Sequence, residues 1–228
     1  MPKIVFMKLS LIVIYLSVAI ISGCKGNSSK PEKIQTTSSD SLIKDVPNWM
    51  KEDTFWLKRI EMLEQKLSLV SLQNGFDGLQ IRIWFECGLS NAQSLVALKK
   101  EKANWTASVY NYRILYGKKT GQQGDHVLDF EVQNVHVENP TPKSGWGTFS
   151  NELDKTNIQD LLDFEKFPNY SIPNDANLIT VQIGLPKKFR VYEYPELGSN
   201  QSIKEGPSRL EEALQLIEKE LEYKRPCL

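Results

Sequence analysis

The chain has 228 residues, of which 40% are hydrophobic and 25% are charged, and this composition excludes a disordered, collagen-like or multi-span membrane chain. Its 28 basic residues are balanced by 28 acidic residues, so it carries no excess positive charge with which to bind a nucleic acid. Three cysteines without a C-x-x-C pair are too few for a disulfide framework and offer no zinc or redox motif. We expect one domain of ordinary size, no cofactor and no nucleic-acid partner.

The N-terminus has the anatomy of a signal peptide. Lys3 and Lys8 supply positive charge, and an apolar run extends from Leu9 to Ile21. As a helix this run is about 20 Å long, which is short of the roughly 30 Å hydrocarbon core of a bilayer, so a permanent transmembrane helix is disfavoured. Initiation at Met7 is an alternative that shortens the leader.

The end of this run, Ile21-Ser22-Gly23-Cys24, resembles the lipobox of bacterial lipoproteins. The resemblance implies that residues 1–23 are a lipoprotein signal peptide, that Cys24 carries a diacylglycerol, and that its new amino group is acylated, for example with palmitate. Two or three long chains hold a protein on a lipid bilayer almost irreversibly, because each buried methylene contributes about 0.8 kcal/mol. The alternatives are an ordinary cleaved signal with a chance cysteine at this position, and an uncleaved anchor.

The residues after Cys24 bear on the destination of such a lipoprotein. In Gram-negative members of the family, an aspartate beside the lipidated cysteine retains the protein at the inner membrane. Lys25, Gly26 and Asn27 stand there instead, so the resemblance implies the outer membrane. The sequence also lacks the early acidic cluster that directs some lipoproteins to the cell surface, which favours the periplasmic leaflet. We therefore expect a lipid-anchored protein of the cell envelope.

Residues 24–45 are predicted to be the lipidated cysteine and a flexible tether, because Ser, Thr, Lys and Pro dominate them and large apolar residues are few. A tether of about 21 residues has a root-mean-square reach of about 25 Å, enough to lift a domain off the lipid headgroups. The remaining residues, 46–228, are the right size for a single domain.

The spacing of hydrophobic residues predicts the elements of this domain. Residues 55–72 have apolar residues at helical spacing, and residues 79–87 alternate between apolar and polar as a strand does. Further strands are predicted over 93–99, 104–116, 127–137, 178–183 and 189–194, and helices over 146–153 and from Ser208, where Glu211 completes a capping box. Strands in the middle with helices at both ends predict an α+β fold, a mostly antiparallel sheet of about five or six strands with helices packed on one face.

The order of these elements resembles a group of uncharacterised predicted lipoproteins of Gram-negative bacteria. The resemblance spans most of residues 55–223 and is carried by Ile81-Arg82-Ile83-Trp84, the Trp105 strand with Tyr110 and Tyr112, Arg190-Val191-Tyr192-Glu193-Tyr194 and the closing helix. It brings no known activity with it.

Few residues of the domain suggest catalysis. A nucleophilic hydrolase needs a Ser or Cys beside a base, and the two histidines, His126 and His136, are about 33 Å apart if one strand holds both. They then cannot share a metal ion or a dyad, and a surface position is expected for each. Asp129 and Glu131 fall on one strand face about 6.6 Å apart, which suits paired-carboxylate glycosidase chemistry, but neighbouring acids on a solvated strand are far commoner.

Structural roles are expected for the remaining charged and sulfur-containing candidates. Arg82 and Glu86 share the polar face of their strand, which favours an ion pair between them. Cys87 continues the apolar face of that strand, and Cys227 is next to the last residue. An oxidising periplasm would permit a disulfide between the two cysteines, but the apolar surroundings favour Cys87 as a buried free thiol.

Aromatic residues are the remaining candidates for a binding surface. Tyr110, Tyr112 and Tyr116 lie on one side of a predicted strand, and Trp84 interrupts a polar face, so a sheet surface could present rings to a sugar or a peptide. Core packing is the commoner use of rings on strands. We expect a membrane-anchored lipoprotein with a non-catalytic binding or scaffolding domain, whose partner is an envelope protein or a glycan. The alternative is a hydrolase acting on glycan or peptide material of the envelope.

Overall fold

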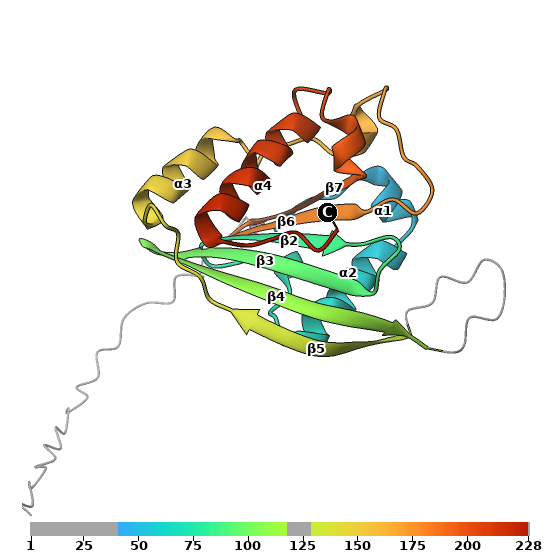
Figure 1. The fold of residues 1–228 in the computed structure, drawn as a ribbon, viewed down its shortest axis with the longest axis horizontal. Coiled ribbons are helices and arrows are strands. Elements are labelled where there is room, and N and C mark those ends of the chain that lie inside the picture. Colours follow the sequence, from blue (N-terminus) through green and yellow to red (C-terminus); the bar gives the residue numbers. More distant parts are fainter. Residues whose placement is uncertain (1–40, 118–128, 228) are drawn as a thin grey trace, which may run out of the picture. The chain divides into compact units, whose positions relative to one another are not determined.

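The structure is a computed structural model that describes residues 41–117 and 129–227. These residues form a seven-stranded sheet with helices on both faces (Figure 1). Helices α3 (Trp146–Lys155) and α4 (Pro207–Leu221) cover one face, and α1 (Asn48–Glu52) and α2 (Phe55–Lys66) cover the other. The strands lie in the order β1-β7-β6-β2-β3-β4-β5, and their bounds are β1 (Ile43–Asp45), β2 (Leu79–Glu86), β3 (Ala92–Glu101), β4 (Asn104–Tyr116), β5 (Phe130–Glu138), β6 (Leu178–Leu185) and β7 (Lys188–Pro195).

The predicted α+β class is confirmed, but the predicted sheet is wrong in three respects. It has seven strands instead of five or six, it is mixed because β1 pairs in parallel with β7, and helices pack on both faces instead of one. The amino-acid composition did not predict β1, because this strand is only three residues long and lies inside the segment 24–45 that is predicted to be a tether. The segment predicted as a tether therefore includes part of the sheet, from Ile43 to Asp45.

Most predicted elements are confirmed, with ends that differ by a few residues. The strands predicted over 93–99 and 104–116 form the antiparallel pair β3–β4, those over 178–183 and 189–194 form the pair β6–β7, and the alternating segment 79–87 forms β2. Helix α2 ends at Lys66, well before residue 72, and Ser68 just beyond it has a left-handed backbone with φ of 57° that cannot continue a helix. The predicted capping box at Ser208 is wrong, because α4 begins at Pro207, whose fixed φ suits the first turn of a helix.

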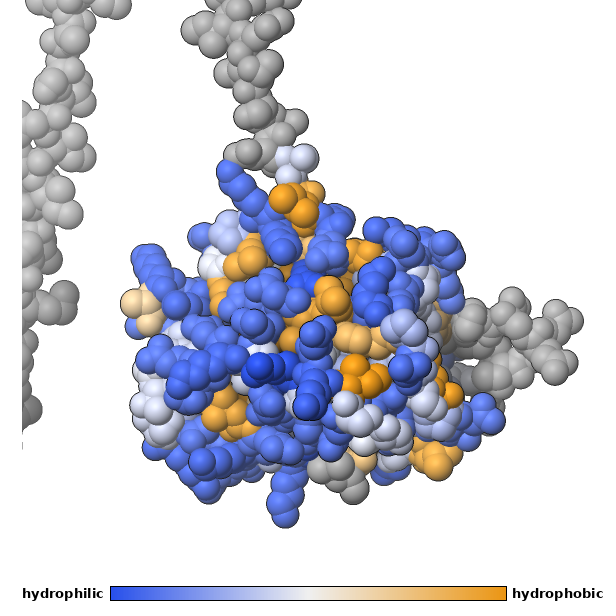
Figure 2. Space-filling model, turned by 90° about the horizontal axis from the view of Figure 1, so that it is seen from above, coloured by the Kyte–Doolittle hydropathy of each residue, from blue (hydrophilic) through white to orange (hydrophobic). Residues whose placement is uncertain are grey.

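The larger hydrophobic core lies between the sheet and helices α3 and α4. Ile81 and Ile83 of β2 point to this side, where Leu210 and Leu214 of α4 pack against the sheet. The period of two along β2 and the period of 3.6 along α4 thus bring their apolar faces together. Seen from above, the outer surface on this side is mostly hydrophilic, with hydrophobic residues in small separated patches (Figure 2). Among the described residues, no helix combines the length and the apolar character of a membrane span.

A smaller core lies on the opposite face of the sheet, under α2. Ile60 and Leu63 of α2 pack there against Trp84, Leu95 and Tyr112. The other side chains of β2 that point to this face are polar or charged. Helix α2 therefore covers charged groups as well as apolar ones. We call this side of the sheet, to which Gln80, Arg82, Trp84 and Glu86 of β2 point, the polar face, and it holds the candidate site.

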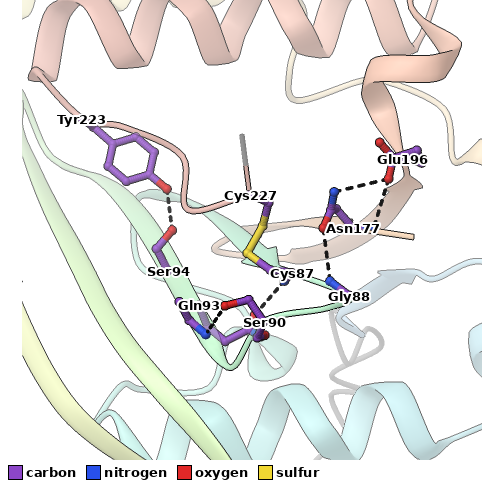
Figure 3. Close-up of a disulfide and its surroundings, with 10 residues drawn as sticks. Cys87, Gly88, Ser90, Gln93, Ser94, Asn177, Glu196, Tyr223 and Cys227 are labelled. Carbon is purple, nitrogen blue, oxygen red and sulfur yellow. Dashed lines mark hydrogen bonds between the residues drawn. A yellow bond between two sulfur atoms is a disulfide. The ribbon is translucent and has the colours of Figure 1, made fainter. Parts of the chain in front are cut away.

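A disulfide joins Cys87, directly after β2, to Cys227 near the C-terminus (Figure 3). The Cα atoms of the two cysteines are 5.3 Å apart, and 140 residues separate them in the sequence. Tyr223 in the same C-terminal tail shares a hydrogen bond with Ser94 of β3 (Figure 3). The predicted free thiol at Cys87 is therefore wrong, and the segment after α4 is fastened to the sheet.

Arg225 adds a second attachment of the tail, this time to α4. Its guanidinium donates to Glu211 at 2.8 Å and to Glu218 at 2.9 Å. The side chain of Arg225 is 10% exposed, so these ion pairs are shielded from solvent far better than a surface pair. The hydrogen bonds to Glu211 are also the main reason that the pKa of the Arg225 guanidinium is raised.

We expect the disulfide to contribute about 2–5 kcal/mol to the free energy of unfolding, because it closes a long loop in the unfolded chain. Urea denaturation of the oxidised protein and of the double variant Cys87→Ala/Cys227→Ala measures this difference. The variant keeps the Arg225 ion pairs, which serve as an internal control for docking of the tail. A thiol titration that finds Cys87 and Cys227 reactive in the native oxidised protein would contradict the bridge.

Candidate functional site

Two buried ion pairs connect α2 to the polar face of the sheet. Arg59 of α2 donates to Glu86 of β2 at 2.7 Å, and Arg82 of β2 donates to Glu64 of α2 at 2.7 Å. The side chains of Arg82 and Glu64 are only 2% and 1% exposed. The predicted pair between Arg82 and Glu86 within β2 is therefore wrong, because each of the two residues pairs with a residue of α2.

Burial shapes the protonation of the inner pair. Desolvation raises the pKa of the Glu64 carboxyl and lowers the pKa of the Arg82 guanidinium, while the attraction between the two groups opposes both shifts. Arg82 also donates to the carbonyl oxygen of Val70 at 2.8 Å, and Gln182 donates to Glu64 at 3.3 Å. These contacts hold Arg82 against the chain that follows α2.

The rings that sequence analysis predicted to face a ligand are divided between the core and the surface. Trp84 is fully buried, and its indole Nε1 donates to Gln182 at 2.7 Å. Tyr112 is also buried, and its hydroxyl has no hydrogen-bond partner in the described part of the chain. Tyr116 is 51% exposed and accepts a hydrogen bond from Arg59, and Tyr110 is half-buried. The predicted exposed patch of rings is therefore wrong for Trp84 and Tyr112.

A groove of about 420 Å³ opens on the part of the polar face that α2 leaves uncovered. We call it the sheet groove. The segment Ser68–Val70, which follows α2, and Phe76 line one part of it, and Asn139, which follows β5, lines another. Its floor comes from three adjacent strands and consists of Gln80 and Arg82 of β2, Ala97 and Lys99 of β3, and Thr106, Ser108 and Tyr110 of β4.

The register of the strands explains the hollow. Arg82 pairs with Ala97, and Ala97 pairs with Ser108, so these three side chains form one row across the sheet. Gln80, Lys99 and Thr106 form the neighbouring row in the same way. Directly paired residues of antiparallel strands point to the same face, and the single methyl group of Ala97 stands between two longer side chains. The floor is therefore lowest at Ala97.

A second cavity of about 690 Å³ adjoins the sheet groove and shares Phe76, Lys99 and Thr106 with it. It extends toward the ends of β3 and β4, where Glu101 and Lys102 lie. The two cavities together cross the sheet from β5 toward the turn at Pro186. An elongated polar molecule would fit this arrangement better than a compact one.

Hydroxyl, amide and cationic groups dominate the chemistry of the sheet groove. Ser108 donates to the amide oxygen of Asn139 at 2.8 Å, and the Lys99 ammonium lies 5.7 Å from the centre of the Phe76 ring. Lys99 also forms an ion pair with Glu101 at 2.8 Å, and the two side chains are 38% and 56% exposed. Groups of this kind bind and orient a polar ligand through hydrogen bonds and charge.

The other predicted candidates do not meet in this groove. His136 lies on the exposed strand β5, where its Nε2 is 3.0 Å from Glu138. Asp129 and Glu131 are also exposed, and Glu131 accepts a hydrogen bond from Gln133 at 3.1 Å. Cys24 and His126 lie outside the described residues. Within the described ranges, no cluster of His, Cys, Asp and Glu is suited to hold a metal ion.

Sequence reasoning missed the sheet groove, although a signal was present. Polar residues recur at every second position at the same ends of three consecutive strands, as in Thr106-Ala107-Ser108. Placing β3 and β4 in hairpin register would have brought these residues into rows beside Gln80 and Arg82.

Comparisons with protein-family models, curated proteins and solved structures find no match to this chain.

Glu193 is a buried acid of the polar face that has no cationic partner in the part of the chain that the structure describes. Glu193 of β7 is 3% exposed, and the Thr180 hydroxyl donates to it at 2.9 Å. Burial raises the pKa of the Glu193 carboxyl to about 8, the Thr180 hydrogen bond lowers it, and the carboxylates of Glu86 and Asp163 raise it further. At neutral pH the native protein therefore holds Glu193 mainly in its protonated form.

We expect the free energy of unfolding to fall as the pH rises from about 5 to 8. The unfolded carboxyl loses its proton near 4.5 and the native one near 8, so between these values the native state binds more protons and a rise in pH destabilises it. In the variant Glu193→Gln, the free energy of unfolding should fall by at least about 1 kcal/mol less over this pH range, measured by urea denaturation at each pH. The matched change at the exposed residue Glu205 should leave the slope as it is, and an unchanged slope in Glu193→Gln would refute the assignment.

Proposed function

We propose that this protein is a lipid-anchored lipoprotein of the cell envelope whose domain binds a ligand in the sheet groove without transforming it. The observation that carries the proposal is the position of Cys24, which directly follows the apolar run and small residues of the leader. The acyl chains on Cys24 would hold the protein on a lipid bilayer, and the tether would separate the domain from the lipid headgroups. The proposed location is the outer membrane, on its periplasmic leaflet.

The disulfide supports a location of the protein outside the cytoplasm. Bonds such as Cys87–Cys227 form and persist in oxidising compartments, including the bacterial periplasm, and are rare where glutathione and thioredoxin keep thiols reduced. This bond also fastens the C-terminal tail, so correct folding of the domain would benefit from export. The leader and the bridge thus point to the same compartment by independent chemistry.

The groove supports binding by the domain. Its hydroxyl and amide groups are suited to hold a polar molecule, and the carboxylates closest to its cations already have partners. Glu64 is paired with Arg82, and Glu101 is paired with Lys99. The proposed partner is a component of the envelope, either a protein or a glycan, in addition to the lipid bilayer itself.

We expect Cys24→Ser to abolish lipid attachment and leave an uncleaved precursor, because the sulfur atom is the acceptor of the diacylglycerol. Metabolic labelling with a fatty-acid probe in a Gram-negative host, followed by mass spectrometry of the purified chain, measures both effects. The matched control is Cys87→Ser/Cys227→Ser, which removes the other two cysteines and should still take up the probe. Undiminished labelling of Cys24→Ser would overturn the anchor.

A further inference from the structure

The sheet groove has the charge and the hydrogen-bonding groups of a site for an acidic glycan. We propose that it binds an oligosaccharide that contains carboxylated sugars, which rests on the binding function proposed above. Such a ligand offers many hydroxyl groups along an elongated chain and places negative charge at intervals. The arrangement of the groove matches each of these properties.

The hydroxyl groups of the ligand have partners along β4. Thr106, Ser108 and Tyr110 occupy alternate positions of this strand and all line the groove. The Tyr110 hydroxyl lies close enough to the Arg82 guanidinium to influence its pKa, and none of the hydrogen bonds among the described residues uses it. Phe76 adds an aromatic ring, and rings with neighbouring polar groups are suited to stack on sugars.

The charge of the groove favours a carboxylate on the ligand. Arg82 and Lys99 line it, and the described residues that form its walls and floor include no acid; Asp77 and Glu101 line only the adjoining cavity. Glu64 neutralises Arg82 from the α2 side, whereas the ion-pair partner of Lys99 within residues 41–117 and 129–227 is the exposed Glu101. Exposed ion pairs contribute little, so a ligand carboxylate can replace Glu101 beside the Lys99 ammonium at small cost.

The position of the groove favours a glycan over a peptide. Extended peptides usually bind by adding a strand to an open sheet edge, where the backbone supplies the hydrogen bonds. The floor of this groove is the face of β2, β3 and β4, not a sheet edge; β2 and β3 are paired on both sides along it, and β4 pairs with β3 throughout and with β5 from Val109 onward. A ligand lying on this floor meets side chains rather than a row of free backbone groups, which suits sugar hydroxyls and carboxylates.

Isothermal titration calorimetry of the full-length protein in detergent micelles tests the proposal with oligogalacturonate as the probe. We expect saturable binding that is at least about tenfold weaker for the uncharged galactose oligomer, since the carboxylates contact Lys99. Ala97→Phe, which fills the lowest point of the floor, should abolish binding. Lys99→Gln should weaken it at least about fivefold. Arg113→Gln, at an exposed position of β4 outside the groove, should bind as the unchanged protein does.

Each alternative outcome has a clear meaning. Equal affinity for the acidic and the uncharged oligomer would overturn the role of charge, and unchanged binding in both Ala97→Phe and Lys99→Gln would overturn the site. Binding of oligoglutamate but of neither sugar would overturn the glycan while leaving the proposed binding function in place. Circular dichroism first establishes that each variant folds, and if Ala97→Phe does not, the variant Lys99→Gln at a half-buried position decides the result.

Discussion

The pairing of buried charges between α2 and the sheet is the constraint on which the rest of this structure depends. Arg82 and Glu86 of β2 point to a face that would otherwise be solvated, and α2 brings Glu64 and Arg59 to meet them. A single buried charge without its partner is costly, so the helix and the strand must stay in one relative position. The apolar residues around these pairs then complete the smaller core.

This constraint also determines which part of the polar face remains open. Helix α2 ends at Lys66, and the chain that follows it is held at Val70 by the Arg82 guanidinium. Beyond that contact α2 no longer covers the sheet, and side chains of three strands form the sheet groove, with Arg82 buried in its floor. The charges that hold the helix in place therefore border the site that we propose for ligand binding, and Arg82 belongs to both.

The sequence predicted the elements better than it predicted their partners. Alternation in residues 79–87 indicated β2 and its two faces, since a period of two is a property of the strand alone. Which face meets solvent depends on where α2 packs, so the burial of Trp84 and Tyr112 could not be read from β2 or β4 alone. The same limit applies to the Cys87–Cys227 bridge and to the rows of the groove, which need the register between strands. The short strand β1 was missed because three residues in a polar segment carry too little pattern.

A double-mutant cycle on Glu64 and Arg82 tests the central physical claim most directly. The single variants Glu64→Met and Arg82→Met each leave one buried charge without its partner and should lower the free energy of unfolding by about 3–5 kcal/mol, measured by urea denaturation. The double variant removes both charges and should cost far less than the sum of the two single changes. Costs that simply add in the double variant would contradict the account, because they would mean that the two groups do not stabilise the protein as a pair.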